Sequence, residues 1–144
     1  MGLRSFLFAP AGRTGQYAFV IVRLVVAGFW LNSAVPRWTA LILGNPKANG
    51  LVRGLFGSGM VVPLTYLFTL LETLGAIALI LGFLTRLAGV WATVEFAITG
   101  TVGLAMGVGG LLKDYGLMAC GIVLLLNGSQ VLSIDGLLAG NKAK

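Results

Sequence analysis

Residues 70–89 read LLETLGAIALILGFLTRLAG, and this stretch decides the fold. It is almost wholly apolar, but an acid, Glu72, lies near its start and a base, Arg86, near its end. The bulky side chains are interrupted by the small residues Gly75, Ala76, Ala78 and Gly82. We expect Glu72 to lie inside a membrane and Arg86 to mark a short turn that leads back into it. The pattern therefore predicts two adjacent membrane spans, around which the rest of the chain is organised.

The composition of the whole chain is that of an integral membrane protein. Of its 144 residues, 58% are hydrophobic and only 10% are charged, whereas soluble domains carry about 25% charged residues. The mean hydropathy is +0.98. This length accommodates roughly four spans of about 20 residues with short connections. We therefore expect a single membrane domain that covers residues 1–144.

Four apolar runs are predicted to form the transmembrane helices of an all-α bundle. They cover about residues 17–35, 63–84, 87–106 and 115–132. Pro36 is expected to end the first span, because proline disrupts a helix interior. Only Thr85 and Arg86 separate the second and third spans, which are therefore expected to form an antiparallel helical hairpin. Gly103 and Gly107 make a GxxxG pair, for which simple helix packing is the favoured interpretation.

The long connection between the first two spans, residues 36–62, is predicted to lie in the membrane interface. It is too apolar to be disordered, and its apolar pieces at 38–43 and 51–56 are too short to cross a bilayer. Each piece has a cation beside it, Arg37 and Arg53 respectively. We therefore expect short interfacial helices that cap one end of the bundle.

The net charge of +6 is carried mainly by residues outside the apolar runs. In a membrane protein such residues contact lipid headgroups and set the topology, so nucleic acid is not expected as a partner. The alternative, that some of them bind an anionic substrate, stays open. The basic residues divide almost evenly between the two sides, and discounting the longest loop favours cytoplasmic N- and C-termini.

The residues that usually hold redox metals are scarce. The chain has no histidine and a single cysteine, Cys120, which excludes an internal disulfide and a CxxC redox pair. Without histidine the usual axial haem ligand is missing. We therefore expect no metal or haem bound by this chain alone, so that electron transfer would need an organic cofactor or a partner subunit.

Three ionised residues, Arg23, Glu72 and Glu95, fall within the predicted spans. At 1.5 Å per residue, Arg23 would lie about 9 Å deep, Glu95 about 12 Å and Glu72 about 14 Å. Such charges are costly in a bilayer and face the bundle interior or a partner. Arg23 could neutralise one glutamate and leave the other uncharged, as a proton donor or acceptor for quinone chemistry. Two alternatives remain: Arg23 extends to nearby headgroups, or the cluster only fixes the helix register.

Three motifs together resemble the DoxX/DoxD family of membrane proteins. The segment LETLGAIALILGFLTRLAGV resembles the family signature, with an acid early in the second span and a G-x-x-T-R turn into the third. VRLVVAGFWLNSAVPRW is similar to its first-span motif, and GSQVLSIDGLL to its closing segment. The matching positions include Arg23, Glu72, Arg86 and Asp135.

The resemblance implies a four-helix bundle in the plasma membrane of a prokaryote. One branch of the family is the membrane subunit of thiosulfate:quinone oxidoreductase, which oxidises thiosulfate to tetrathionate and reduces quinone. Our leading hypothesis is a redox-associated subunit that binds quinone and works with a second subunit or as a homo-oligomer. Thiosulfate would contact Arg23, Arg37 or Arg53. Protons would be handled by Glu72 or Glu95, and the quinone ring would be lined by Trp30, Trp38 and Tyr66.

Two other functions are compatible with the sequence. A non-catalytic accessory subunit of a larger membrane complex is favoured by the small size and the absence of cofactor ligands. A small-solute transporter is a weaker option, because the chain shows no inverted internal repeat. Whether the chain is an enzyme is left open.

Overall fold

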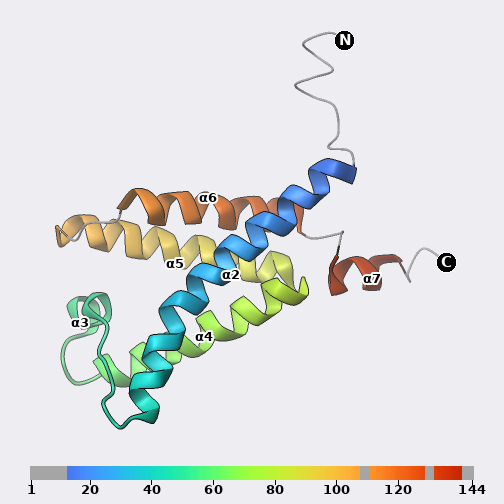
Figure 1. Ribbon diagram of the computed structural model, residues 1–144. Helices are drawn as coiled ribbons and strands as arrows, with labels where there is room; N and C mark the ends of the chain where they lie inside the picture. The colour runs from blue at the N-terminus through green and yellow to red at the C-terminus, as the bar shows by residue number, and fades with distance from the viewer. Residues whose placement is uncertain (1–12, 108–110, 129–131, 141–144) are drawn as a thin grey trace.

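The computed structural model describes residues 13–107, 111–128 and 132–140, and every regular element within these ranges is a helix (Figure 1). The helices are α2 (Arg13–Ile42), α3 (Gly50–Phe56), α4 (Val61–Leu81), α5 (Thr85–Ala105), α6 (Leu111–Asn127) and α7 (Ile134–Gly140). The predicted all-α class is therefore confirmed for this part of the chain.

Three of the described helices are long and apolar enough to cross a membrane. They are the Tyr17–Ile42 part of α2, α4 and α5, each with a mean hydropathy of at least 1.4. These helices indicate a bilayer environment, as predicted. The 17 residues of α6 reach only about 26 Å at 1.5 Å per residue, which is less than the ~30 Å hydrocarbon core. The predicted fourth span therefore remains a proposal.

The long helices pack as two main pairs. α2 lies along α4, and α5 lies along α6, while the contact between α4 and α5 is much smaller (Figure 1). Residues 82–84 reverse the chain between α4 and α5, as the sequence predicts, with Gly82 and Leu84 both in left-handed backbone conformations. Although they are joined by this turn, α4 packs more closely on α2, and α5 packs more closely on α6, than α4 and α5 pack on each other.

The close approach of α5 and α6 depends on two glycines. A Cβ at Gly89 would lie 2.6 Å from the backbone nitrogen of Leu125, and one at Gly121 would lie 2.7 Å from that of Thr93. No side chain fits at such distances, so the two backbones are in contact at these positions. The predicted GxxxG pair does not lie on one helix, because α5 ends at Ala105, and a Cβ at Gly107 would meet nothing within 4 Å.

The core contains mostly small and aromatic residues. Trp30 is fully buried and stacks on Phe96 with ring centroids 6.3 Å apart. Gly75 provides the space for the indole, because a Cβ there would lie 2.6 Å from a ring carbon of Trp30. The outer faces of the long helices carry exposed leucine, isoleucine and valine side chains, as expected of a surface that faces lipid.

The prediction that Pro36 ends the first span is wrong. α2 continues through Pro36 to Ile42, and its last turns are held against α4 by side chains. Tyr66 Oη donates to the carbonyl of Arg37 at 3.1 Å, and Trp38 Nε1 donates to Thr73 Oγ1 at 2.9 Å. These contacts compensate for the one backbone hydrogen bond that proline removes, as in other membrane helices. The predicted interfacial piece at 38–43 therefore belongs almost entirely to α2.

The connection from α2 to α4 is consequently shorter than expected, residues 43–60, and it contains α3. Asn49 begins this short helix: its side chain accepts a hydrogen bond from the backbone nitrogen of Leu51 at 2.9 Å. The backbone nitrogen of Asn49 donates to Thr65 Oγ1 at 3.0 Å, which ties α3 to α4. The predicted apolar piece at 51–56 thus forms a short helix that packs on the bundle.

Candidate functional site

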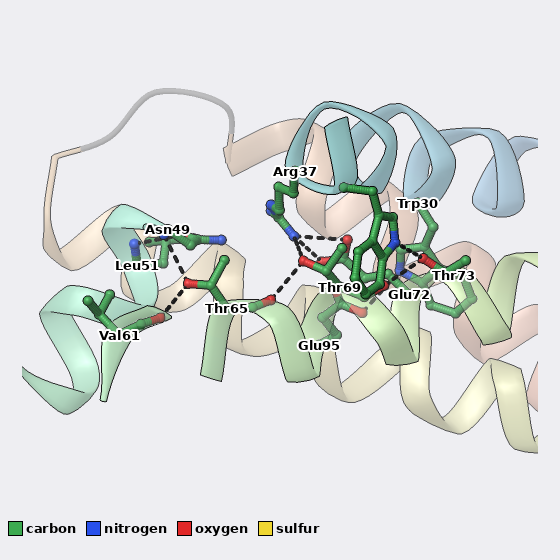
Figure 2. Close-up of polar contacts among 11 residues, drawn as sticks. Trp30, Arg37, Asn49, Leu51, Val61, Thr65, Thr69, Glu72, Thr73 and Glu95 are labelled. Atoms are coloured by element: carbon green, nitrogen blue, oxygen red, sulfur yellow. Dashed lines mark hydrogen bonds and ion pairs between the residues drawn. The ribbon is translucent and has the colours of Figure 1, made fainter. Parts of the chain in front are cut away.

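The strongest polar contact in the bundle joins α2 to the middle of α4. Arg37 Nη1 donates to both carboxylate oxygens of Glu72, at 2.9 and 3.0 Å, and to Thr69 Oγ1 at 3.2 Å (Figure 2). Glu72 is buried, with only 4% of its surface exposed. Burying a charge is tolerated when a hydrogen-bonded partner of opposite sign is present. Glu72 is therefore paired, as predicted, but with a different arginine.

Glu95 extends this contact from α5. Its Oε2 accepts a hydrogen bond from Trp30 Nε1 at 3.0 Å, and its carboxyl group lies within hydrogen-bonding reach of the Glu72 carboxyl (Figure 2). A hydrogen bond between two carboxyl groups requires that one of them carry a proton. The cluster thus contains two acids and one base, Arg37.

A row of threonines prepares the face of α4 on which the cluster is built. Thr65, Thr69 and Thr73 follow each other at intervals of four residues, and each hydroxyl donates to the carbonyl four residues earlier. Each oxygen is then free to accept a hydrogen bond from Asn49, Arg37 and Trp38 respectively. Sequence reasoning missed this row, although its spacing on the same face as Glu72 was a readable signal.

A cavity of about 140 Å³ lies between α3, α4 and α5, and both carboxyl groups line it. Its other walls are apolar or aromatic apart from two polar residues, Asn49 and Thr99. Phe68 and Trp91 stack with centroids 6.0 Å apart in one wall. The full lining is Asn49, Leu51, Val52, Leu55, Phe56, Phe68, Glu72, Trp91, Val94, Glu95, Ile98, Thr99 and Val102.

Arg23 does not join the glutamates. Its Nη2 donates to the carbonyl of Leu132 at 3.0 Å, and a Cβ at Gly82 would lie 2.6 Å from its Nη1. Ten residues of helix separate this point from Glu72, about 15 Å along α4. The predicted pairing of Arg23 with Glu72 is therefore not formed. Because α2 does not end at Pro36, Arg37 lies within the span and takes that place.

The residues near Arg23 form a separate contact at the turn between α4 and α5. Asp135 accepts hydrogen bonds from the backbone nitrogens of Leu84 and Thr85 at 2.9 and 2.8 Å, and its own nitrogen donates to the carbonyl of Gly82 at 3.0 Å. Asp135 thus supplies the N-terminal cap that Leu84 cannot provide. Arg86 is exposed in the first turn of α5, so it follows the chain reversal at residues 82–84 and does not lie within the turn as predicted.

The residues expected to bind an anion are spread over the molecule. Arg23 lies at the α7 end of α4, Arg37 is bound to Glu72, and Arg53 is exposed on α3. Thus the three arginines do not converge on one site in this structure.

The expected quinone-binding aromatics lie outside the cavity lining. Trp30 is linked to the lining by its hydrogen bond to Glu95. Trp38 and Tyr66 pack on each other with centroids 5.8 Å apart. The aromatic residues that line the cavity are instead Phe56, Phe68 and Trp91, and no sequence motif singles these out.

Within the described ranges, no group of three or more histidine, cysteine or carboxylate residues could hold a metal ion. No protein-family profile, no curated protein and no solved structure matches this chain. The function must therefore be argued from the cavity and its two carboxyl groups.

Proposed function

We propose that this chain is a redox-associated membrane subunit that binds a quinone in the cavity between α3, α4 and α5. The observation that supports this most is the carboxyl pair Glu72 and Glu95 in the wall of an otherwise apolar, partly aromatic cavity. A quinone headgroup is a flat ring that packs on aromatic side chains. Its reduction consumes protons, which a protonated carboxyl group in the wall can supply.

The wider proposal follows the DoxX/DoxD resemblance. In it, α6 completes a bundle of four transmembrane helices with both termini in the cytoplasm of a prokaryote, and the chain works with a second subunit or a second copy of itself. Thiosulfate would be the electron donor. Among the described residues, the cavity lining includes no cation, so a thiosulfate site would lie outside the cavity, for example at the exposed Arg53 or on the partner subunit.

Quinone binding is tested by filling the cavity. Val94 lines it from α5, whereas Val90 lies one turn earlier, is similarly exposed and does not line it. Val94→Phe should weaken the binding of a short-chain ubiquinone analogue at least about 10-fold, equivalent to about 1.4 kcal/mol. Val90→Phe should leave binding unchanged. Quenching of tryptophan fluorescence in lipid nanodiscs measures the affinity, and equal affinities for both variants and the wild type would contradict the site.

The enzymatic part of the proposal needs a separate assay. The chain, reconstituted with its partner subunit, should reduce the quinone analogue when thiosulfate is added. Absence of this reaction while the analogue still binds would remove thiosulfate as the donor and leave the binding site intact.

A second candidate function is a non-catalytic accessory subunit. The contact that favours it is the ion pair of Arg37 and Glu72, which joins α2 to α4 and serves equally well to fix the helix register. Glu72→Gln separates the two functions. Loss of quinone reduction with intact assembly supports the redox subunit, whereas loss of assembly with normal quinone binding supports the structural one.

A further inference from the structure

We infer that Glu95 is the residue that carries the exchangeable proton of the cavity, and that Trp30 positions its carboxyl group. The inference rests on the proposed function for the identity of the ligand, but the location of the proton follows from the hydrogen bonds alone. Nothing in the sequence distinguishes the two glutamates in this way.

Glu72 is held as the anion. Both of its oxygens accept from Arg37 Nη1, at 2.9 and 3.0 Å, and a guanidinium group stays positively charged in proteins. Such charge-assisted hydrogen bonds favour the ionised carboxylate. Because Glu72 is held in this ion pair, we take it as the acceptor in its contact with Glu95.

The proton of that contact therefore belongs to Glu95. Its Oε2 accepts from Trp30 Nε1 at 3.0 Å, so Oε1 is the oxygen better suited to bear the proton. Glu95 is also less buried than Glu72, and it lines the cavity. A ligand that enters the cavity thus meets the proton-bearing carboxyl group.

Trp30 is suited to position this group because its indole cannot turn. It is fully buried, stacks on Phe96 and is seated against Gly75. Its N–H is therefore fixed in direction and holds Oε2 as the carbonyl oxygen of the carboxyl group. This selects Oε1 as the atom that binds the proton.

In the proposed reaction, two thiosulfate ions would give two electrons on forming tetrathionate, and the quinone would take up these electrons and two protons. Glu95 would supply one of these protons, its O–H bond breaking as an O–H bond forms on the quinone oxygen. The second proton would come from solvent, and so would the proton that afterwards restores the Glu95 carboxyl group.

Infrared spectroscopy of the purified chain in a detergent without ester groups tests the assignment without any ligand. A protonated carboxyl group gives a carbonyl stretching band separate from those of carboxylates and amides. Glu95→Gln should remove this band. Trp30→Phe should move the band to higher frequency, because the carbonyl oxygen loses its hydrogen-bond donor. An aromatic side chain is kept at this position.

Trp38→Phe is the matched control. Trp38 is an indole on the same helix whose Nε1 donates to Thr73 and not to a carboxyl group. Its replacement should leave the band in place. A band that survives Glu95→Gln, or that shifts equally in the two tryptophan variants, would overturn the inference. If Glu95→Gln does not fold, Glu95→Asp is measured instead. This variant should retain the carbonyl band at a shifted frequency, and a band at the wild-type frequency would overturn the inference.

Failure of the inference and failure of the proposed function give different results. If the band behaves as expected but the ubiquinone analogue does not quench the wild-type fluorescence, Glu95 carries the proton and the ligand is not a quinone. If the analogue binds and the band is independent of Glu95, the cavity stands and the proton belongs elsewhere.

Discussion

Two polar clusters, one in the middle of α4 and one at its C-terminal end, each contain an arginine and an acid but are built differently. The acid-pair cluster (Arg37, Glu72 and Glu95) joins side chain to side chain and borders a cavity. The turn cluster (Arg23, Gly82 and Asp135) joins side chains to backbone at the junction with α7. In the first, a ligand in the cavity would lie beside both carboxyl groups. In the second, Arg23 and Asp135 both bond to backbone groups, which suits this cluster to hold the fold.

The difference shows that an arginine and an acid within apolar helices do not by themselves indicate chemistry. What separates the two clusters is the surplus acid and the space beside it. The acid-pair cluster has two carboxyl groups for one guanidinium, and both line the cavity. In the turn cluster, a Cβ at Gly82 would already overlap Ser133, so this position is filled by protein atoms.

The largest expected effect comes from breaking the ion pair of the acid-pair cluster. Arg37→Leu leaves Glu72 buried without its cation, which should lower the free energy of unfolding by about 3 to 5 kcal/mol. The double variant Arg37→Leu, Glu72→Leu removes both charges and should recover much of this loss. Denaturant titration in mixed micelles measures both. A single variant as stable as the double variant would show that the pair is not buried as described.

The next effect concerns the close packing of the turn cluster. Gly82→Ala introduces a Cβ at φ +63° that overlaps Ser133 and Arg23. Backbone strain of about 1 kcal/mol and overlap of about 2 kcal/mol should together lower the stability by about 3 kcal/mol. Gly44→Ala is the control, because Gly44 has φ +70° but nothing within 4 Å. Only the strain should appear there, and equal losses at both glycines would contradict the close packing.

The smallest effect tests the cap of the turn cluster. Asp135→Ala leaves the backbone nitrogens of Leu84 and Thr85 without their acceptor, which should cost about 1 to 2 kcal/mol. Asp114→Ala provides a comparison at the start of α6, where the acid is 3.9 Å from Lys113. Loss there should stay below about 1 kcal/mol. Hydrogen exchange at residues 84 and 85 should rise only in the first variant; if it stays slow, another group caps α5.

The membrane class could be read from the sequence because it depends on composition. The apolar runs, the reversal of the chain after Gly82 and the special position of Glu72 all follow from local pattern. The end of α2 could not be read in this way. Pro36 is a helix breaker in isolation, and only the contacts of Trp38 and Tyr66 with α4 and α2 explain why the helix continues.

The identity of the charged partners was likewise beyond the sequence. Depth along the membrane normal placed Arg23 near Glu95 and Glu72, but it said nothing about the direction in which a side chain points around its helix. Continuation of α2 brought Arg37 to Glu72 instead. The close glycines were misjudged for a related reason: Gly103 and Gly107 match a motif, whereas Gly89 and Gly121 meet only once α5 and α6 are packed.

The sequence by itself thus determined that the chain enters a membrane, that it is helical and that an acid lies inside it, because each depends on the cost of placing polar groups in hydrocarbon. Tertiary structure alone decided which arginine pairs with Glu72, where the cavity lies and that two carboxyl groups meet in its wall. These features depend on side chains from helices far apart in the sequence, and the packing angles that bring such helices together are not encoded in any single segment.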